Sequence, residues 1–394
     1  MIKRLYAKLI SGVNRIKRRT IRHLDSQSVK KMKAGVLLKV LLRVAILLVV
    51  VLSVFYFTGA RVKENKPLES PVRQGTATSV PENGVGSVIP RTSRPKDGLS
   101  TFVGKDVDVL IEAKGKPERI EPSGYDYDWW VYSGEKSFMV GVTDDGLVNQ
   151  FYTTDNTSNV APFEIGQNLT DIYRFTIVES EINIEIDESI YTFTLNNEDL
   201  QTRPLIVFKG LYVQLFIDQE DGELEALRFI DPATLVLHQP YEMTYTGELI
   251  VSTPRSSTLQ SEVDLTVERQ VFEITNKYRV NNGVPKLQND YELGVFASEY
   301  SQKMALEIYT TEESTESEKL SKRLKEAEIE HRKAGENIAF DYVDAIEAVH
   351  GWLNSPSHRK VLLDKDFTHI GTGAYGNYYV QSLIESTRVE IRQK

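Results

Sequence analysis

Glu347 and His350 form a pair whose spacing points directly to chemistry. They lie three residues apart, and on a helix this spacing places a carboxylate and an imidazole on one face, as in helices that ligate carboxylate-bridged metals. The same spacing is common on ordinary solvated helices. We therefore expect Glu347 and His350 to lie on the solvated face of a helix.

Residue types exclude several other chemistries. The chain has no cysteine, so disulfides, thiolate metal sites and a cysteine nucleophile are excluded. Ser355 lies near His358 in the sequence, but no serine has the Gly-x-Ser-x-Gly surroundings of a nucleophile elbow. Gly371 and Gly373 lack the strand-turn-helix context of a nucleotide-binding loop.

The C-terminal third reads as helices followed by strands. Apolar residues at helical spacing predict a helix over 267–278 that closes at Asn281-Asn282-Gly283. Asp290 can cap a second helix, and further helices are expected around 320–327 and 343–353. Strands at 369–375 and 378–384 follow, joined by a Gly376-Asn377 turn.

Residues 99–245 read as a β-rich α+β domain. Short apolar or aromatic runs alternate with turn residues, and Asp145-Gly146 between Val142 and Leu147 is a strong hairpin signal. A short helix is expected within 105–113. The layout of 103–152 recurs loosely at 165–230, which predicts two similar halves, although convergent turn chemistry could produce the same pattern.

Charge is distributed unevenly along the chain. Residues 1–60 hold 13 lysines and arginines against one acid, Asp25, whereas residues 61–394 hold 34 basic and 55 acidic residues. An acidic body does not suit nucleic acid, because binding there depends on neutralising phosphates. We therefore expect no nucleic-acid partner.

The apolar run at 36–58 predicts a single transmembrane helix. It is long enough to span a bilayer, Lys39 and Arg43 can extend to the headgroups, and the basic residues before it place the N-terminus in the cytoplasm. A cleaved signal peptide, suggested by the small residues near Ala60, and a buried helix of a soluble domain are the alternatives. An uncleaved anchor, single-pass in the cell membrane with an extracytoplasmic body, is favoured because more than thirty residues precede the run.

These patterns together give the expected organisation of the chain. Five prolines and few large apolar residues indicate a linker at 59–98, and a shorter linker is expected at 246–262. The predicted parts are a basic cytoplasmic segment at 1–35, the membrane helix at 36–58, a linker at 59–98, an α+β domain at 99–245, a linker at 246–262 and a C-terminal domain at 263–394.

Four motifs occur in order in the C-terminal domain: Asn276-Lys277-Tyr278-Arg279, Gly335-Glu336-Asn337, Gly351-Trp352 with Ser355-Pro356-Ser357-His358-Arg359, and Phe367-Thr368-His369-Ile370-Gly371. Together they resemble the CAP superfamily of cysteine-rich secretory proteins, antigen 5 and pathogenesis-related 1 proteins. The preceding part, with Gly115-Lys116-Pro117 and Trp129-Trp130, resembles the CAP-associated domain of some spore-forming Gram-positive bacteria. The resemblance implies a C-terminal α-β-α sandwich after the β-rich α+β domain.

The resemblance also implies a central cleft where two histidines and two acids can hold a divalent metal. Glu336 and His358 match this set, whereas Glu312 stands in place of the first histidine and Ser355 in place of the second acid. Asn337 and His369 complete the expected cleft. Glu336 and His358 could form an acid/base pair or, with Glu312, bind Zn²⁺ or Mg²⁺. Alternatively, Glu336 fixes its own loop and His358 caps the helix after Pro356.

Three roles follow as expectations. The first is a non-enzymatic, membrane-anchored protein that binds a cell-wall, lipid or protein partner. The second is a degenerate metal-assisted hydrolase of peptides or wall polymers that uses Glu336 and His358. The third is a purely structural protein of the envelope.

Overall fold

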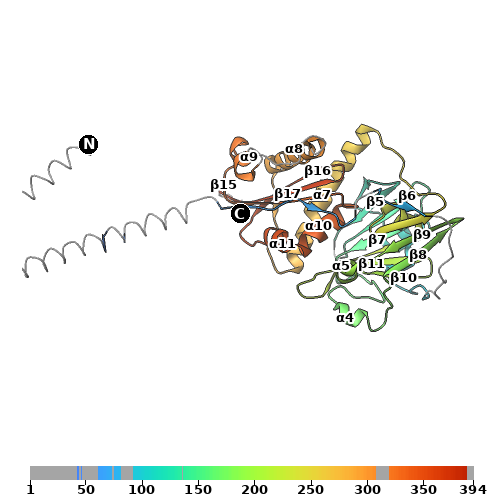
Figure 1. Cartoon of the computed structure of the whole chain (residues 1–394). Helices are drawn as coiled ribbons and strands as arrows, with labels where there is room; N and C mark the ends of the chain where they lie inside the picture. Colours follow the sequence, from blue (N-terminus) through green and yellow to red (C-terminus); the bar gives the residue numbers. More distant parts are fainter. Residues whose placement is uncertain are drawn as a thin grey trace, which may run out of the picture. The chain divides into compact units, whose positions relative to one another are not determined.

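The structure of the chain is a computed structural model that describes residues 42–43, 46, 61–72, 75–80, 92–134, 136–307 and 319–387. The chain divides into two compact units, Met1–Gly59 and Ala60–Lys394. The features below belong to the second unit, which contains both the β-rich part and the helical C-terminal part (Figure 1).

The transmembrane helix expected at 36–58 is not shown, which corrects the predicted fold class. A span needs about 20 consecutive apolar residues in one helix, and no helix among the described residues has that length and apolar character. Only residues 42, 43 and 46 of this range are described. The predicted basic segment at 1–35 lies outside the described residues.

A mixed sheet forms the centre of the C-terminal part. Its main path runs β1-β15-β17-β16-β14, and β2 pairs with β15 beside β1. The strands are β1 (Arg61–Glu64), β2 (Leu68–Glu69), β14 (Gln288–Asn289), β15 (His331–Phe340), β16 (His369–Tyr375) and β17 (Tyr378–Ser386). The predicted late strands are therefore confirmed, with Gly376 in a left-handed conformation at their turn.

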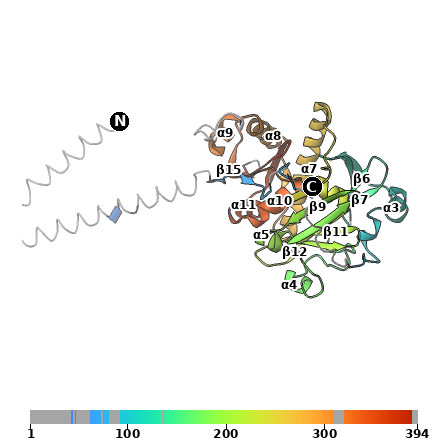
Figure 2. The same ribbon diagram turned by 45° about the vertical axis from the view of Figure 1, so that its right-hand side comes forward.

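Helices cover both faces of this sheet, as Figures 1 and 2 show. They are α7 (Ser257–Asn281), α8 (Tyr291–Glu307), α9 (Leu320–Glu326), α10 (Ala345–Asn354) and α11 (Pro356–Leu362). Helices α8 and α9 lie on one face, and α10 and α11 lie on the other with α7 (Figures 1 and 2). This is the three-layer arrangement that the CAP resemblance implies.

Two glycines of β16 allow α8 to lie directly on the sheet. A Cβ atom at Gly371 would lie 2.1 Å from the carbonyl carbon of Leu293, and one at Gly373 would lie 2.2 Å from the carbonyl carbon of Ala297. Both neighbours are backbone atoms of α8, which cannot move aside as a side chain can. The glycine pair therefore serves helix packing.

Residues expected in the first linker form strands of the C-terminal sheet. β1 pairs in parallel with β15, with Glu64 opposite Glu336, and the Lys63 ammonium lies 2.5 Å from a carboxylate oxygen of Asp364. Within the second expected linker, α7 begins at Ser257, where the hydroxyl of Ser256 accepts a hydrogen bond from the Leu259 amide. Both linkers are consequently shorter than expected.

The β-rich part contains a seven-stranded sheet and a smaller four-stranded sheet. The large sheet has the order β10-β11-β12-β7-β6-β5-β4 and the small sheet the order β3-β13-β9-β8. The large sheet consists of β4 (Arg119–Pro122), β5 (Tyr127–Tyr132), β6 (Phe138–Thr143), β7 (Val148–Thr153), β10 (Leu205–Phe208), β11 (Leu211–Ile217) and β12 (Leu224–Ile230). The small sheet consists of β3 (Thr78–Ser79), β8 (Glu181–Ile186), β9 (Ser189–Thr194) and β13 (Glu242–Thr246). The helices here are η1 (Leu99–Phe102), α3 (Val107–Lys114), α4 (Leu169–Ile172), α5 (Asn197–Thr202) and α6 (Pro232–His238).

The two halves of this part, in which an internal repeat is predicted, share matching backbone hydrogen bonds. The Gly104 amide donates to the Val148 carbonyl at 2.6 Å, and the Gly166 amide donates to the Leu224 carbonyl at 2.8 Å. Asp106 caps α3 and Asn168 caps α4 in the same way. The β6–β7 and β11–β12 hairpins then meet where β7 pairs with β12, so the two halves share one sheet.

Candidate functional site

Glu336 is buried on β15 and is held by two partners. Its carboxylate forms a buried ion pair with the Arg323 guanidinium of α9 and accepts a hydrogen bond from the Ser382 hydroxyl at 2.8 Å. Arg323 is fixed in turn by the Tyr300 ring, whose centroid lies 3.5 Å from the guanidinium carbon. Since both carboxylate oxygens are engaged and the charge is already neutralised, Glu336 is a poor candidate for a general base or a metal ligand.

His358 is also satisfied within the protein. Its Nε2 lies 2.9 Å from the backbone oxygen of Lys66 and donates to it, so Nδ1 accepts from the Ser355 hydroxyl at 2.8 Å. Burial lowers the pKa of His358, which keeps the ring neutral near pH 7. The role of His358 here is to hold the segment between β1 and β2 against α11.

The structure does not bring Glu336 and His358 together. Glu336 and Asn337 are consecutive residues of a strand, so their side chains point to opposite faces of the sheet. The Asn337 amide donates to the His358 carbonyl at 3.1 Å, which places His358 on Asn337's face. Glu336 faces Arg323 on the side of α8 and α9. The expected acid/base pair is therefore divided by the sheet.

The other expected cleft residues do not complete a metal site. The Ser355 hydroxyl contacts His358. His369 lies at the start of β16, where it pairs with Gln288 and Ile384. Glu312 lies outside the described residues. No group of three or more His, Asp or Glu side chains in the described part could hold a metal. Among the described residues, Glu336 and His358 therefore do not form the Zn²⁺ or Mg²⁺ site that the resemblance implies.

Glu347 and His350, expected on a solvated face, are almost fully buried, so that prediction was wrong. The Glu347 carboxylate accepts from Arg203 Nη1 and from Gln214 Nε2, each at 2.9 Å. His350 Nε2 lies 3.1 Å from the carbonyl oxygen of Thr202, and burial lowers the pKa of His350 to about 3. All of these partners belong to the β-rich part.

A second buried ion pair joins the same two parts. Arg228 of β12 is fully buried, and its Nη2 lies 2.5 Å from Oδ2 of Asp344, the residue that caps α10. Arg228 interrupts the apolar run that forms β12. A charged residue inside such a run could have predicted a buried ion pair here, since buried charges require partners.

Apolar residues from both parts also share one hydrophobic core. Trp129 of β5 and Phe216 of β11 belong to the same buried cluster as Val271 of α7 and Trp352 of α10. Trp130, its neighbour, packs partly buried on the other face, against the core of the large sheet. The β-rich and C-terminal parts therefore form one continuous body.

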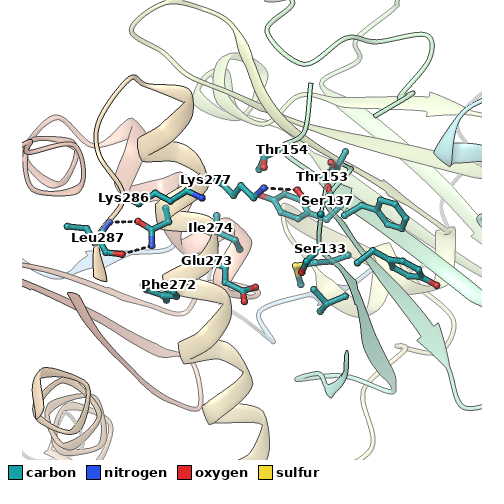
Figure 3. A pocket seen from close by; sticks show the side chains of 17 residues that line it. Ser133, Ser137, Thr153, Thr154, Phe272, Glu273, Ile274, Lys277, Lys286 and Leu287 are labelled. Atoms are coloured by element: carbon teal, nitrogen blue, oxygen red, sulfur yellow. Dashed lines mark hydrogen bonds between the residues drawn. The ribbon is translucent and has the colours of Figure 1, made fainter. Parts of the chain in front are cut away.

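A cavity of about 320 Å³ lies along this junction. Figure 3 shows α7 on one side of it and the strands of the large sheet on the other. Val131, Met139 and Tyr152 line the strand side, and Ile274 and Leu287 line the other side. Lys277 crosses the gap, with its Nζ 2.8 Å from the Ser137 hydroxyl (Figure 3). Apolar walls with a few polar groups are typical of small-molecule sites, and no sequence motif predicted this one.

Comparisons with known proteins match both parts. A model of the CAP-associated N-terminal domain matches residues 103–241, and a model of the cysteine-rich secretory protein family matches residues 272–384. The uncharacterized membrane protein YlbC of Bacillus subtilis (strain 168) is 39% identical over 297 residues, which cover 75% of this chain and 86% of that protein. The uncharacterized protein YkwD of the same strain is 37% identical over 115 residues, 29% of this chain and 43% of that one.

Solved structures show the same fold over both parts. An extracellular protein containing a SCP domain from Bacillus anthracis is 30% identical, with a TM-score of 0.69, and the match covers 77% of this chain and all of that one. A cysteine-rich secretory protein from Staphylococcus aureus is 24% identical with a TM-score of 0.69, over 82% of this chain and all of that one.

Proposed function

The chain is a CAP domain protein of a Gram-positive bacterium, a member of the cysteine-rich secretory protein family, and from this premise we propose that it acts outside the cytoplasm as a binding protein of the cell envelope. Under this proposal Glu336 and His358, which match the CAP motifs, have a structural role. The binding surface is then provided by the CAP part and the CAP-associated part together.

The observation that carries the proposal is the state of Glu336. Its charge is neutralised by Arg323, both of its oxygens are engaged, and His358 lies on the other face of the sheet. Acid/base chemistry by this pair needs the imidazole beside the carboxylate. The engagement of Glu336 by Arg323 and Ser382, with His358 on the opposite face, supports a binding role instead.

The names of two relatives support the location. The Bacillus anthracis structure is described as extracellular and the Bacillus subtilis relative as a membrane protein. The chain is similar to both along most of its length. These names support a folded part that lies outside the cytoplasm, in association with the envelope.

The experiment is a pull-down of the full-length protein from its own envelope fraction, using wild type, Glu336→Gln and His358→Gln. Binding that depends on the fold predicts the same captured components for all three, provided that each variant keeps a cooperative thermal transition. Purified wall and peptide substrates are incubated in parallel with and without Zn²⁺ and Mg²⁺. Release of products by wild type, lost in either folded variant, would show that the protein is a hydrolase and end the proposal.

A further inference from the structure

The cavity between α7 and the strands β5, β6 and β7 has the features of a site for one class of small molecule. We propose that it binds an amphiphile with a single alkyl chain and an anionic head. This inference rests on the proposed binding function and names its ligand class.

The walls of the cavity determine the apolar part of the ligand. Val131, Met139, Tyr152, Ile274 and Leu287 line it and are each buried. They come from strands on one side and from α7 and the segment after it on the other. Because these five lining residues are apolar or aromatic, the surface in the cavity favours a ligand that covers it with methylene groups rather than with polar atoms.

The volume limits the length of the chain. At about 30 Å³ for each water-sized atom, the 320 Å³ of the cavity has room for roughly ten non-hydrogen atoms. This is at the lower limit of small-molecule sites. One alkyl chain of eight to ten carbons fits this room, whereas a two-chain lipid or a folded peptide segment does not.

The charged groups determine the head. Lys277 and Lys286 both line the cavity, and in Figure 3 both side chains start on the α7 side of the gap, with Lys277 reaching across it to Ser137. The acid at the cavity, Glu273, is already engaged by Arg119 at 2.5 Å. Because Arg119 neutralises Glu273, the two lysines leave the described lining with a net positive charge. The Lys277 ammonium has three donors and spends one on Ser137, which leaves donors for a carboxylate or phosphate.

The experiment is calorimetric titration of the full-length protein with octanoate, decanoate, decyl phosphate, decanol and decyltrimethylammonium, each below the concentration at which it forms micelles. Burial of a methylene strengthens binding about fourfold, so decanoate is expected to bind about fifteenfold more tightly than octanoate. Decanoate or decyl phosphate should bind more tightly than decanol, and the cation should bind weakest. Equal binding of the anionic and cationic decyl compounds would overturn the proposed head group.

Two variants with matched controls test the location. Lys286 is exposed, so Lys286→Glu should weaken decanoate binding about fivefold or more and leave decanol binding unchanged. The control is Lys325→Glu on α9, which is exposed and does not line the cavity. Ser133→Trp places an indole at the rim and should abolish binding of every chain, whereas Ser261→Trp, on an exposed turn of α7, should not.

The outcomes separate this inference from the proposed function. Titrations without a chain-length dependence, or binding that survives Ser133→Trp in a folded protein, refute the cavity as an amphiphile site. In that event, the pull-down from the envelope still decides whether the protein is a binding protein. A product-releasing activity that depends on Glu336 would instead remove the proposed function itself.

Discussion

Replacing Arg228 with methionine tests whether the buried ions hold the two parts of the protein together. The Arg228 side chain is fully buried and lies 2.5 Å from Asp344 and 3.9 Å from Glu347. Methionine fills much of the same space but leaves both carboxylates buried with one cation fewer. Breaking a buried ion pair in this way costs about 3–5 kcal/mol of unfolding free energy.

The double variant Arg228→Met/Asp344→Asn separates the charge effect from the packing effect. Asparagine still caps α10 about as well as aspartate, and the uncompensated charge is gone. We therefore expect the double variant to be more stable than Arg228→Met alone, with a coupling energy of about 2–3 kcal/mol. Arg174→Met serves as a control, because Arg174 pairs with Asp171 on an exposed surface, where such pairs contribute about 0–1 kcal/mol.

The assay is urea unfolding followed by circular dichroism, with the midpoint and the slope fitted separately. A single transition is expected for wild type, since one core spans both parts. A loss below about 1 kcal/mol for Arg228→Met, or additive effects in the double variant, would refute the view that this pair fixes the junction.

Three further predictions concern other parts of the structure. Gly373→Ala should lower the free energy of unfolding by about 3 kcal/mol, because the added Cβ meets the α8 backbone at Ala297. Gly294→Ala, on α8 itself, adds its Cβ in open space and should not lower the melting temperature. Burial holds the pKa of His350 at about 3, below the unfolded value near 6.5. The neutral ring therefore contributes its full stability above pH 6.5, and this contribution declines as the pH falls. In melting experiments between pH 6 and 4, His350→Gln should remove a pH dependence of the unfolding free energy of up to about 1.4 kcal/mol per pH unit. Val62→Asp should lower the free energy of unfolding by about 2 kcal/mol, and with it the urea midpoint, because Val62 packs on the cluster around Ile384. An unchanged midpoint would show that this segment behaves as a linker.

Local signals predicted much of the fold. Asp290 accepts from the Leu293 amide at 3.0 Å and begins α8, and Asn282 ends α7, as expected from the sequence. Asp145-Gly146 lies at the turn between β6 and β7, with Gly146 at a φ of 82°. Each of these features depends on contacts within a few residues, which is why composition and spacing were sufficient.

Features that depend on distant partners were not predicted. Glu347 appeared to be a surface residue because its helix gives no sign of Arg203, 144 residues earlier. Motif matching located Glu336 and His358 in the sequence but did not assign them to faces. The alternation of side chains along β15 separates them, and this follows only when the motif is placed on a strand. The cavity is formed by two parts of the chain and so has no sequence motif of its own.

The pairing of β1 with β15 also sets an order of events during synthesis. Asn65 and Asn337, which lie side by side with their amides 3.1 Å apart, are separated by 272 residues of chain. A ribosome adds about 5–20 residues each second, so β1 leaves the exit tunnel roughly 15–50 s before its partner strand exists. During that interval the entire CAP-associated part can fold between the two. The last strands then have to close a sheet whose first strand was made long before, and until they do, the backbone groups of β1 lack the partner strand that the folded sheet supplies.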